Sequence, residues 1–268
     1  MSAVHALLGR ERAITVAGLA LLTLLAWIYL WRGAGMGMSA LDMTTLALFP
    51  HDQPEPMPGM VMPPITFVTV VAMWWVMMIA MMTPSAAPLI LTYSRVLQHT
   101  AMQGRMTNAH APTLFLVCGY LAMWLVFSVI AAALQFVLQR GGAISSMMLW
   151  SNSAWLSAAV LIAAGVYQLS PLKQVCLKHC RGPVQFLTKH WRPGRFGAFA
   201  MGMRHGAWCV GCCWLLMTLL FVGGVMNVVW IVLLAVLVLM EKATTHGVMM
   251  SRATGLLLIV WGVATALR

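Results

Sequence analysis

The sequence has 268 residues, of which 62% are hydrophobic and 8% charged, and its mean hydropathy is +0.88. Soluble domains are about 45–50% apolar and about 25% charged, so this composition excludes a soluble enzyme or a disordered chain and indicates a membrane protein. Sixteen Lys and Arg against five Asp and Glu give a net charge of +11, which in a membrane protein indicates basic cytoplasmic loops rather than nucleic-acid binding.

Seven apolar segments are candidate membrane spans, which need about 20 residues with a range of about 17–25. In chain order they cover residues 14–31, 65–82, 113–138, 154–172, 207–222, 225–240 and 248–267. The fifth and sixth are short and are joined only by Gly223 and Gly224, so the pattern allows six to eight crossings. We therefore predict an all-α, polytopic transmembrane helical bundle with about seven spans.

The distribution of charge predicts the orientation. The first segment ends in Trp31 and Arg32 rather than in a small-residue cleavage site, so we interpret it as a retained helix and not as a signal peptide. With a cytoplasmic N-terminus, thirteen Lys and Arg lie inside, and only Arg32, Arg140 and Arg268 lie outside. Cytoplasmic loops carry the excess of basic residues, so we predict a cytoplasmic N-terminus and one integral membrane domain over residues 1–268.

Five of the six cysteines fall between residues 176 and 213. Cys176 and Cys180 lie four residues apart after Pro171, so on a helix that begins there both sulfurs share one face. The second group follows at spacings of three and four in HGAWCVGCCW: Cys209, Cys212 and Cys213. In the predicted topology both groups lie at the cytoplasmic ends of consecutive spans. We therefore expect four or five thiols to converge there.

Thiolates bind soft metals as groups, so this arrangement predicts a metal or redox site. His179, His205 and Glu241 are candidate additional ligands, or groups that contact the ligands. A carboxylate against the bilayer is costly without a partner, and Lys242 or a metal is expected to supply one. Cys118 lies apart from the cluster, and we interpret it as a packing residue. The reducing cytosol disfavours a structural disulfide.

Thioethers form a second soft-metal pattern. They lie in the outer loop and along the second apolar segment at helical spacing: Met57, Met60 and Met62, then Met73, Met77 and Met81. An outer set of thioethers followed by inner thiols would hand Cu(I) from weaker to stronger ligands. A methionine stripe is also typical of adaptable packing between helices. Both interpretations stay open at this point.

Several strings have a specific order and spacing: MMIAMMTPSAAP, YQLSPLKQVCLKHCRGP, GMRHGAWCVGCCWLLM, GGVMN and the EK pair at 241 and 242. They closely resemble a bacterial family of unknown function described as predicted metal-binding integral membrane proteins. The resemblance covers roughly residues 66–245, which leaves 1–65 as an N-terminal helix and a Met-containing outer loop. It implies a multi-pass protein of the bacterial inner membrane. It also implies that the family's ligands are Cys176, Cys180, Cys209, Cys212 and Cys213.

Three functions are compatible with these patterns. The leading hypothesis is a membrane protein that binds a soft metal, with copper favoured over zinc or iron, for transport, delivery or homeostasis. Its partners would be the lipid bilayer and a metal chaperone or a metalloenzyme under assembly. The alternatives are a thiol–disulfide oxidoreductase that uses CVGCC and CLKHC, and a structural or assembly subunit in which metal joins two helices. The sequence has no nucleophile with a paired base, no phosphate-binding loop and no carboxylate dyad, which disfavours a hydrolase or a nucleotide-driven pump.

Overall fold

The computed structural model describes residues 2–35, 39–41, 44, 66–102, 110–145 and 149–267, and within these ranges it is helical with no sheet. The helices are α1 (Ser2–Trp31), α2 (Phe67–Met102), α3 (His110–Arg140), α4 (Ala154–Leu169), α5 (Pro171–Arg181), α6 (Pro183–His190), α7 (Gly194–Thr218), α8 (Leu220–Gly223), α9 (Val228–Ala243) and α10 (Gly247–Ala266). The predicted all-α class is therefore confirmed.

Five helices are long and apolar enough to cross a membrane. Their candidate spans are Arg12–Trp31, Phe67–Thr100, Ala111–Arg140, Gly194–Gly223 and Gly247–Ala266. The pair α4 and α5, bent by 65° at its junction, makes a sixth when it is counted as one span. The described residues thus contain five or six candidate spans, which makes the protein a multi-pass membrane protein. The predicted segment 225–240 corresponds to α9, whose 16 residues are fewer than the usual 20 or so.

The predicted start of the fifth segment at residue 207 is wrong, because α7 begins at Gly194. Hydropathy placed the start too late because Arg204 and His205 interrupt the apolar run. The backbone continues as a helix through both residues, with Arg204 exposed and His205 buried. As a result Cys209 and its two neighbouring cysteines lie in the middle of a long helix and not at its beginning.

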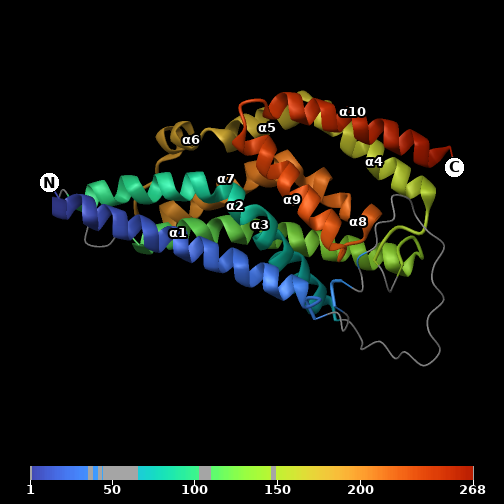
Figure 1. Cartoon of the computed structure of the whole chain (residues 1–268), viewed down its shortest axis with the longest axis horizontal. Helices are drawn as coiled ribbons and strands as arrows, with labels where there is room; N and C mark the ends of the chain where they lie inside the picture. The colour runs from blue at the N-terminus through green and yellow to red at the C-terminus, as the bar shows by residue number, and fades with distance from the viewer. Residues whose placement is uncertain are drawn as a thin grey trace.

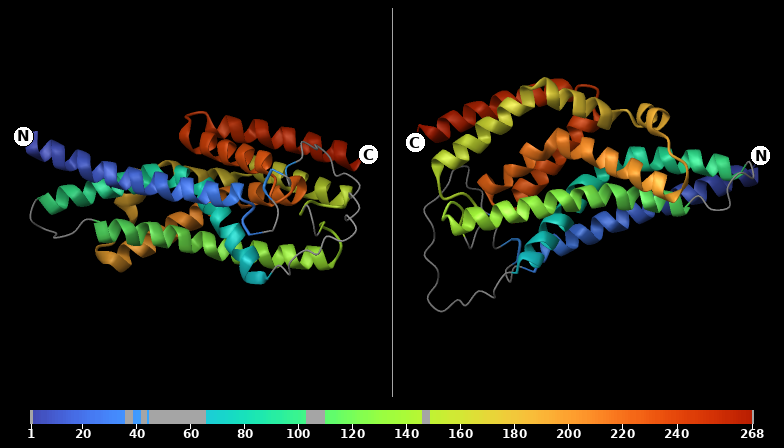
Figure 2. Two further views of the ribbon diagram at one scale, coloured as in Figure 1. Left: turned by 60° about the horizontal axis from the view of Figure 1, so that its bottom comes forward. Right: turned by 180° about the vertical axis from the view of Figure 1, so that it is seen from behind.

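Two helix pairs dominate the packing: α3 with α7, and α4 with α10. In Figure 1, α4 and α10 run side by side along the upper edge, and the chain termini lie at opposite ends of the molecule; Figure 2 (right) shows the same pair from behind. Glycines allow both pairs to approach closely: a Cβ on Gly119 or Gly202 would collide with the facing backbone of the α3–α7 pair, and one on Gly165 or Gly255 with that of the α4–α10 pair. Small residues have this role at contacts between membrane helices.

The bend between α4 and α5 positions the cysteines of α5. The Ser170 side chain accepts a hydrogen bond from the Lys173 amide, and Pro171 occupies the first turn, so the second helix begins at a defined residue. The Tyr167 hydroxyl donates to the Gly211 carbonyl on α7. Because Gly211 has no side chain, Cys176 fits directly against α7 at this point. These contacts hold one face of α5 against the middle of α7.

Candidate metal centre

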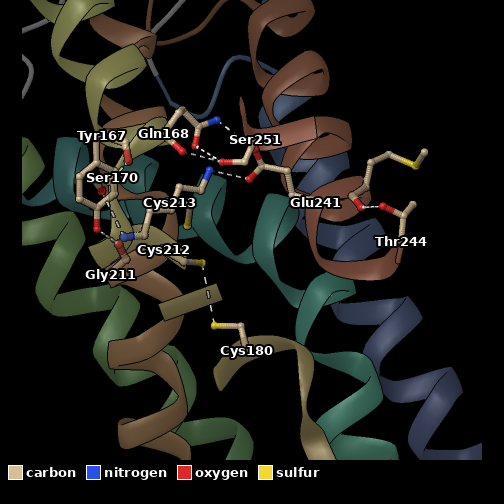
Figure 3. A network of polar contacts seen from close by, with 12 residues as sticks. Tyr167, Gln168, Ser170, Cys180, Gly211, Cys212, Cys213, Glu241, Thr244 and Ser251 are labelled. Carbon is tan, nitrogen blue, oxygen red and sulfur yellow. Dashed lines mark hydrogen bonds and ion pairs between the residues drawn. The ribbon is translucent and has the colours of Figure 1, made fainter. Parts of the chain in front are cut away.

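The convergence of thiols is the main feature of the α5–α7 contact. The sulfurs of Cys180 and Cys212 lie 3.9 Å apart, and Figure 3 shows the two side chains turned toward each other from neighbouring helices. The Cys180 thiol interacts with those of Cys209 and Cys212, which in turn interact with the Cys213 thiol one turn along α7. We call these four residues the thiol cluster. All of them are free cysteines.

Local hydrogen bonds fix the sulfurs of α7. The thiols of Cys212 and Cys213 donate to the Cys209 carbonyl at 3.1 and 3.0 Å, one helical turn back. These bonds hold both sulfurs close to Cys209 within one turn of α7. Cys209, Cys212 and Cys213 are buried, whereas Cys180 is half-buried. Cys176, the fifth predicted ligand, is buried beside the cluster against Gly211.

A lysine brings positive charge to the thiol cluster. The Lys242 Nζ donates to the Cys209 sulfur at 2.9 Å and to the Ser85 hydroxyl at 3.1 Å. The Tyr120 hydroxyl lies 3.1 Å from the same sulfur and donates to the Met82 carbonyl. Helices α2, α3 and α9 therefore complete the surroundings of a cluster built by α5 and α7. Sequence reasoning named Lys242 only as a partner for Glu241 and missed Ser85 and Tyr120.

Glu241 has a different partner from the predicted one. Its Oε2 lies 2.7 Å from the Lys173 Nζ, and the two side chains are 2% and 0% exposed. Gln168 donates to the other carboxylate oxygen at 2.9 Å, and Ser251 donates to the Gln168 carbonyl at 3.0 Å; Figure 3 shows this network beside the cysteines. Adjacent residues on a helix point in different directions, so Glu241 and Lys242 meet different neighbours.

The two candidate histidines occupy different environments. His205 is buried, lies one turn before Cys209 on α7, and its Nδ1 has no hydrogen-bond partner within the described part of the chain. Its ring lies 5.9 Å from the ring of Tyr120 and 5.2 Å from that of Phe186. His179 instead stacks on Trp208 with ring centroids 4.2 Å apart. Of the two, His205 is the one with an unused nitrogen beside the cluster.

Of the six candidate methionines, three lie outside the described residues and three lie on α2. Met57, Met60 and Met62 lie outside the described residues. The three on α2 are buried and spaced four residues apart: Met73, Met77 and Met81. The same spacing continues to Ser85, which contacts Lys242. The buried thioether stripe therefore leads along α2 to the edge of the thiol cluster.

Comparison with known families identifies the chain. The sequence pattern of the PpoB2 family, described as copper chaperone, matches residues 71–265. The chain belongs to the PpoB2 copper chaperone family. The matched region contains all five clustered cysteines and extends beyond residue 245, where the resemblance seen in the sequence strings ended. No curated protein and no solved structure matches the chain.

Membership of a copper chaperone family implies copper binding, and the donors in the α5–α7 contact fit a copper ion. Thiolates are soft ligands that select Cu(I) over harder cations. Among the described residues, no three His, Cys, Asp or Glu side chains are placed to hold one ion together. A pair of thiolates is sufficient for Cu(I), so the chemistry of the thiol cluster fits this ion better than one that requires four ligands.

Proposed function

We propose that this member of the copper chaperone family binds Cu(I) at the thiol cluster inside the membrane domain and delivers it to a partner protein. The observation that carries the proposal is the meeting of four thiols from two helices beside the Lys242 ammonium. Cys176, packed next to the cluster, supplies a fifth sulfur. His205 is the proposed nitrogen donor during exchange, because its buried Nδ1 lacks a partner.

Charge balance supports a role for Lys242. A Cu(I) ion held by two thiolates carries a net charge of −1, and a charge in a low-dielectric interior is costly unless an opposite charge lies close by. The Lys242 Nζ lies 2.9 Å from the Cys209 sulfur, so its ammonium offsets that charge. Glu241 is paired with Lys173 and leaves the Lys242 charge directed at the sulfurs.

Differences in exposure suggest how the ion would be transferred. Cys180 is half-buried, whereas the three cysteines of α7 are buried. A thiol of a partner protein can therefore reach Cys180 first and replace it as a ligand. We propose that Cys180 is the ligand that a partner thiol replaces and that a thiolate of α7 holds the ion while this exchange occurs.

We also propose how the chain crosses the membrane and which route copper takes to the thiol cluster. Seven membrane-crossing segments with a cytoplasmic N-terminus, in one domain of the bacterial inner membrane, would place the two termini on opposite sides. Their positions at opposite ends of the molecule support this arrangement. The stripe of Met73, Met77 and Met81 would then lead from the outer half of the bundle toward the thiol cluster. Copper arriving from outside would move from thioethers to stronger thiolate ligands.

Copper analysis of the detergent-purified protein tests this function. Wild-type protein is loaded with Cu(I) without oxygen beside C209S/C212S/C213S, with Cys118→Ser as a control outside the cluster. We expect stoichiometric copper in the wild type and the control and none in the triple variant, with helical content by circular dichroism unchanged. Equal copper in the triple variant, or a preference of the wild type for zinc or iron over copper, would contradict the proposal.

The separation of 3.9 Å between the Cys180 and Cys212 sulfurs also supports a second candidate, the thiol–disulfide oxidoreductase. A disulfide requires the sulfurs to approach to about 2.05 Å, a short movement from this position. Alkylation and mass spectrometry of protein exposed to an oxidised dithiol partner distinguish the two functions. A disulfide between Cys180 and Cys212, formed with reduction of the partner, would favour the oxidoreductase. Thiols that stay reduced would favour copper delivery.

A further inference from the structure

A basic cavity lies between α5 and α6, beside the thiol cluster. Its volume is about 200 Å³, and its lining includes Lys178, His179, Phe186, Lys189 and His190. None of the residues that line it is acidic. The nearest turn of α5 also carries Cys180, but the cavity walls are formed by nitrogen-bearing side chains rather than by sulfur.

Backbone contacts fix the two imidazoles that line the cavity. The Nδ1 of His179 bonds to the Val175 carbonyl at 2.9 Å, and the Nδ1 of His190 bonds to the Phe186 carbonyl at 3.1 Å. A carbonyl oxygen only accepts hydrogen bonds, so each Nδ1 is the donor. In both rings Nε2 is therefore the acceptor, so the imidazoles shape the cavity, and the lysines are the groups that can bind an anion. The stacking of His179 on Trp208 holds the first of these rings in place.

The charge of the cavity favours an anion. Lys178 and Lys189 are both exposed and contribute two ammonium groups with no carboxylate among the lining residues. The buried carboxylate of Glu241 on α9 does not offset this charge, because it is paired with Lys173. Ammonium groups bind phosphate oxygens as point charges. The two ammonium groups in this cavity therefore match the oxygen atoms of a phosphate group.

Exposed apolar side chains place this cavity at a membrane surface. Val184 on α6 is 61% exposed, and Phe196 at the start of α7 is 84% exposed. Trp191, between the two helices, is 40% exposed. Short helices that combine basic residues with exposed aromatic and aliphatic residues lie at the boundary between headgroups and acyl chains. The cavity is thus at the depth where lipid phosphates are found.

From these observations we infer that the cavity between α5 and α6 is a phosphate-binding site whose ligand is the headgroup of an anionic phospholipid. The inference goes beyond copper delivery and does not depend on it. The cavity lies near the proposed copper site, because the ring of Phe186, which lines it, is 5.2 Å from the ring of His205. A lipid bound here would cover the surface of α5 that leads to Cys180.

The test compares two double variants with the same loss of charge. K178Q/K189Q removes the ammonium groups of the cavity, and R192Q/R195Q removes two exposed charges that do not line it. Each protein is placed in mixed micelles of phosphatidylglycerol and phosphatidylcholine, and native mass spectrometry counts the lipids retained. A basic residue near an anionic surface contributes about fivefold in affinity, so we expect K178Q/K189Q to lose affinity for phosphatidylglycerol by about thirtyfold. The loss in R192Q/R195Q should be clearly smaller, because its arginines do not line the cavity.

A second arm identifies the source of the phosphate. The same proteins are titrated with inorganic phosphate in lipid-free detergent, and binding is measured by isothermal titration calorimetry. Phosphate binding that is lost in K178Q/K189Q, without enrichment of phosphatidylglycerol, would support the site but assign it to a soluble phosphate. Absence of both ligands from the wild type, or equal loss in the two double variants, would overturn the inference. If the double variant fails to fold, the single variants Lys178→Gln and Lys189→Gln replace it. Each is expected to lose about fivefold in affinity for phosphatidylglycerol.

Discussion

Two adjacent residues at the end of α9 face two different polar sites in the interior of the bundle. Glu241 enters a network in which both carboxylate oxygens have partners, supplied by Lys173 and Gln168. Lys242 enters the thiol cluster, where its ammonium meets the Cys209 sulfur and the Ser85 hydroxyl. The first site joins hard, oppositely charged groups that satisfy each other. The second leaves soft sulfur atoms available for a ligand.

The helices that each site connects differ as well. The Glu241 network joins α4, α5, α9 and α10 through Gln168, Lys173 and Ser251. The thiol cluster and its contacts join α2, α3, α5, α7 and α9. Burial and charge alone therefore do not identify a binding site in this bundle. A satisfied network holds helices together, whereas a site with unused donor atoms is available to a metal.

The largest expected effect is on stability, at the Glu241 network. Glu241→Ala leaves the buried Lys173 ammonium without its partner, and loss of one member of a buried ion pair costs about 3–5 kcal/mol. We expect a large fall in the thermal unfolding midpoint in detergent. The fraction that stays folded should bind copper as the wild type does, because Glu241 does not contact the thiols.

The double variant K173M/E241L is the matched control for this prediction. Replacing both members of a buried ion pair by apolar residues of similar size is often neutral or stabilising. We therefore expect its unfolding midpoint to return close to the wild-type value. A midpoint for Glu241→Ala equal to that of the wild type would remove the distinction between the two sites.

Cys180→Ser should produce the largest single loss of copper affinity. In a site of two thiolates each thiolate is essential, so we expect a loss of about a hundredfold or more, or roughly 3 kcal/mol. Competition with a chromogenic Cu(I) chelator measures the change, and Cys118→Ser provides the control. If the affinity of Cys180→Ser stays within a factor of two or so of the control, α5 does not contribute to the site.

Lys242→Met should weaken Cu(I) binding by about tenfold, in the range of effects seen when a group that contacts a metal ligand is removed. Unlike Glu241→Ala, it should leave the unfolding midpoint almost unchanged, because no buried carboxylate loses its partner. Lys242→Arg keeps the charge and should retain most of the affinity. A loss of stability without a loss of copper affinity in Lys242→Met would place this lysine with the structural network.

Cys176→Ser is expected to have the smallest effect. Its side chain packs against Gly211 at the margin of the thiol cluster, so we expect a change in Cu(I) affinity of no more than about threefold. Chelator competition beside Cys180→Ser gives the ranking directly. A larger loss in Cys176→Ser than in Cys180→Ser would move the centre of the site toward the start of α5.

Most of the fold could be predicted from hydropathy, because apolar length decides whether a helix can span a bilayer. The start of α5 at Pro171 was also predictable, since proline after a capping serine favours a first turn. The start of α7 was not, because a hydropathy window ends at Arg204 and His205 although the helix passes through both. The short length of α9 was predicted, but its start was not, because the N-cap at Asn227 begins the helix three residues after the apolar run does.

The candidate site was predictable to the extent that it follows helical spacing. Spacings of three and four residues placed Cys209, Cys212 and Cys213 on one face of α7, as the structure has them. The partner of Glu241 was not predictable, because it depends on how α5 crosses α9 and not on local sequence. Lys173 looked like one more basic residue of an inner loop, yet its side chain is buried.

The measurement that tests the central claim most directly is the X-ray absorption spectrum of the Cu(I)-loaded, detergent-purified protein. We predict a first shell made of sulfur alone, lost in C209S/C212S/C213S and preserved in Cys118→Ser and Glu241→Ala. A first shell of nitrogen or oxygen, or a sulfur shell that survives in the triple variant, would contradict copper binding at the thiol cluster.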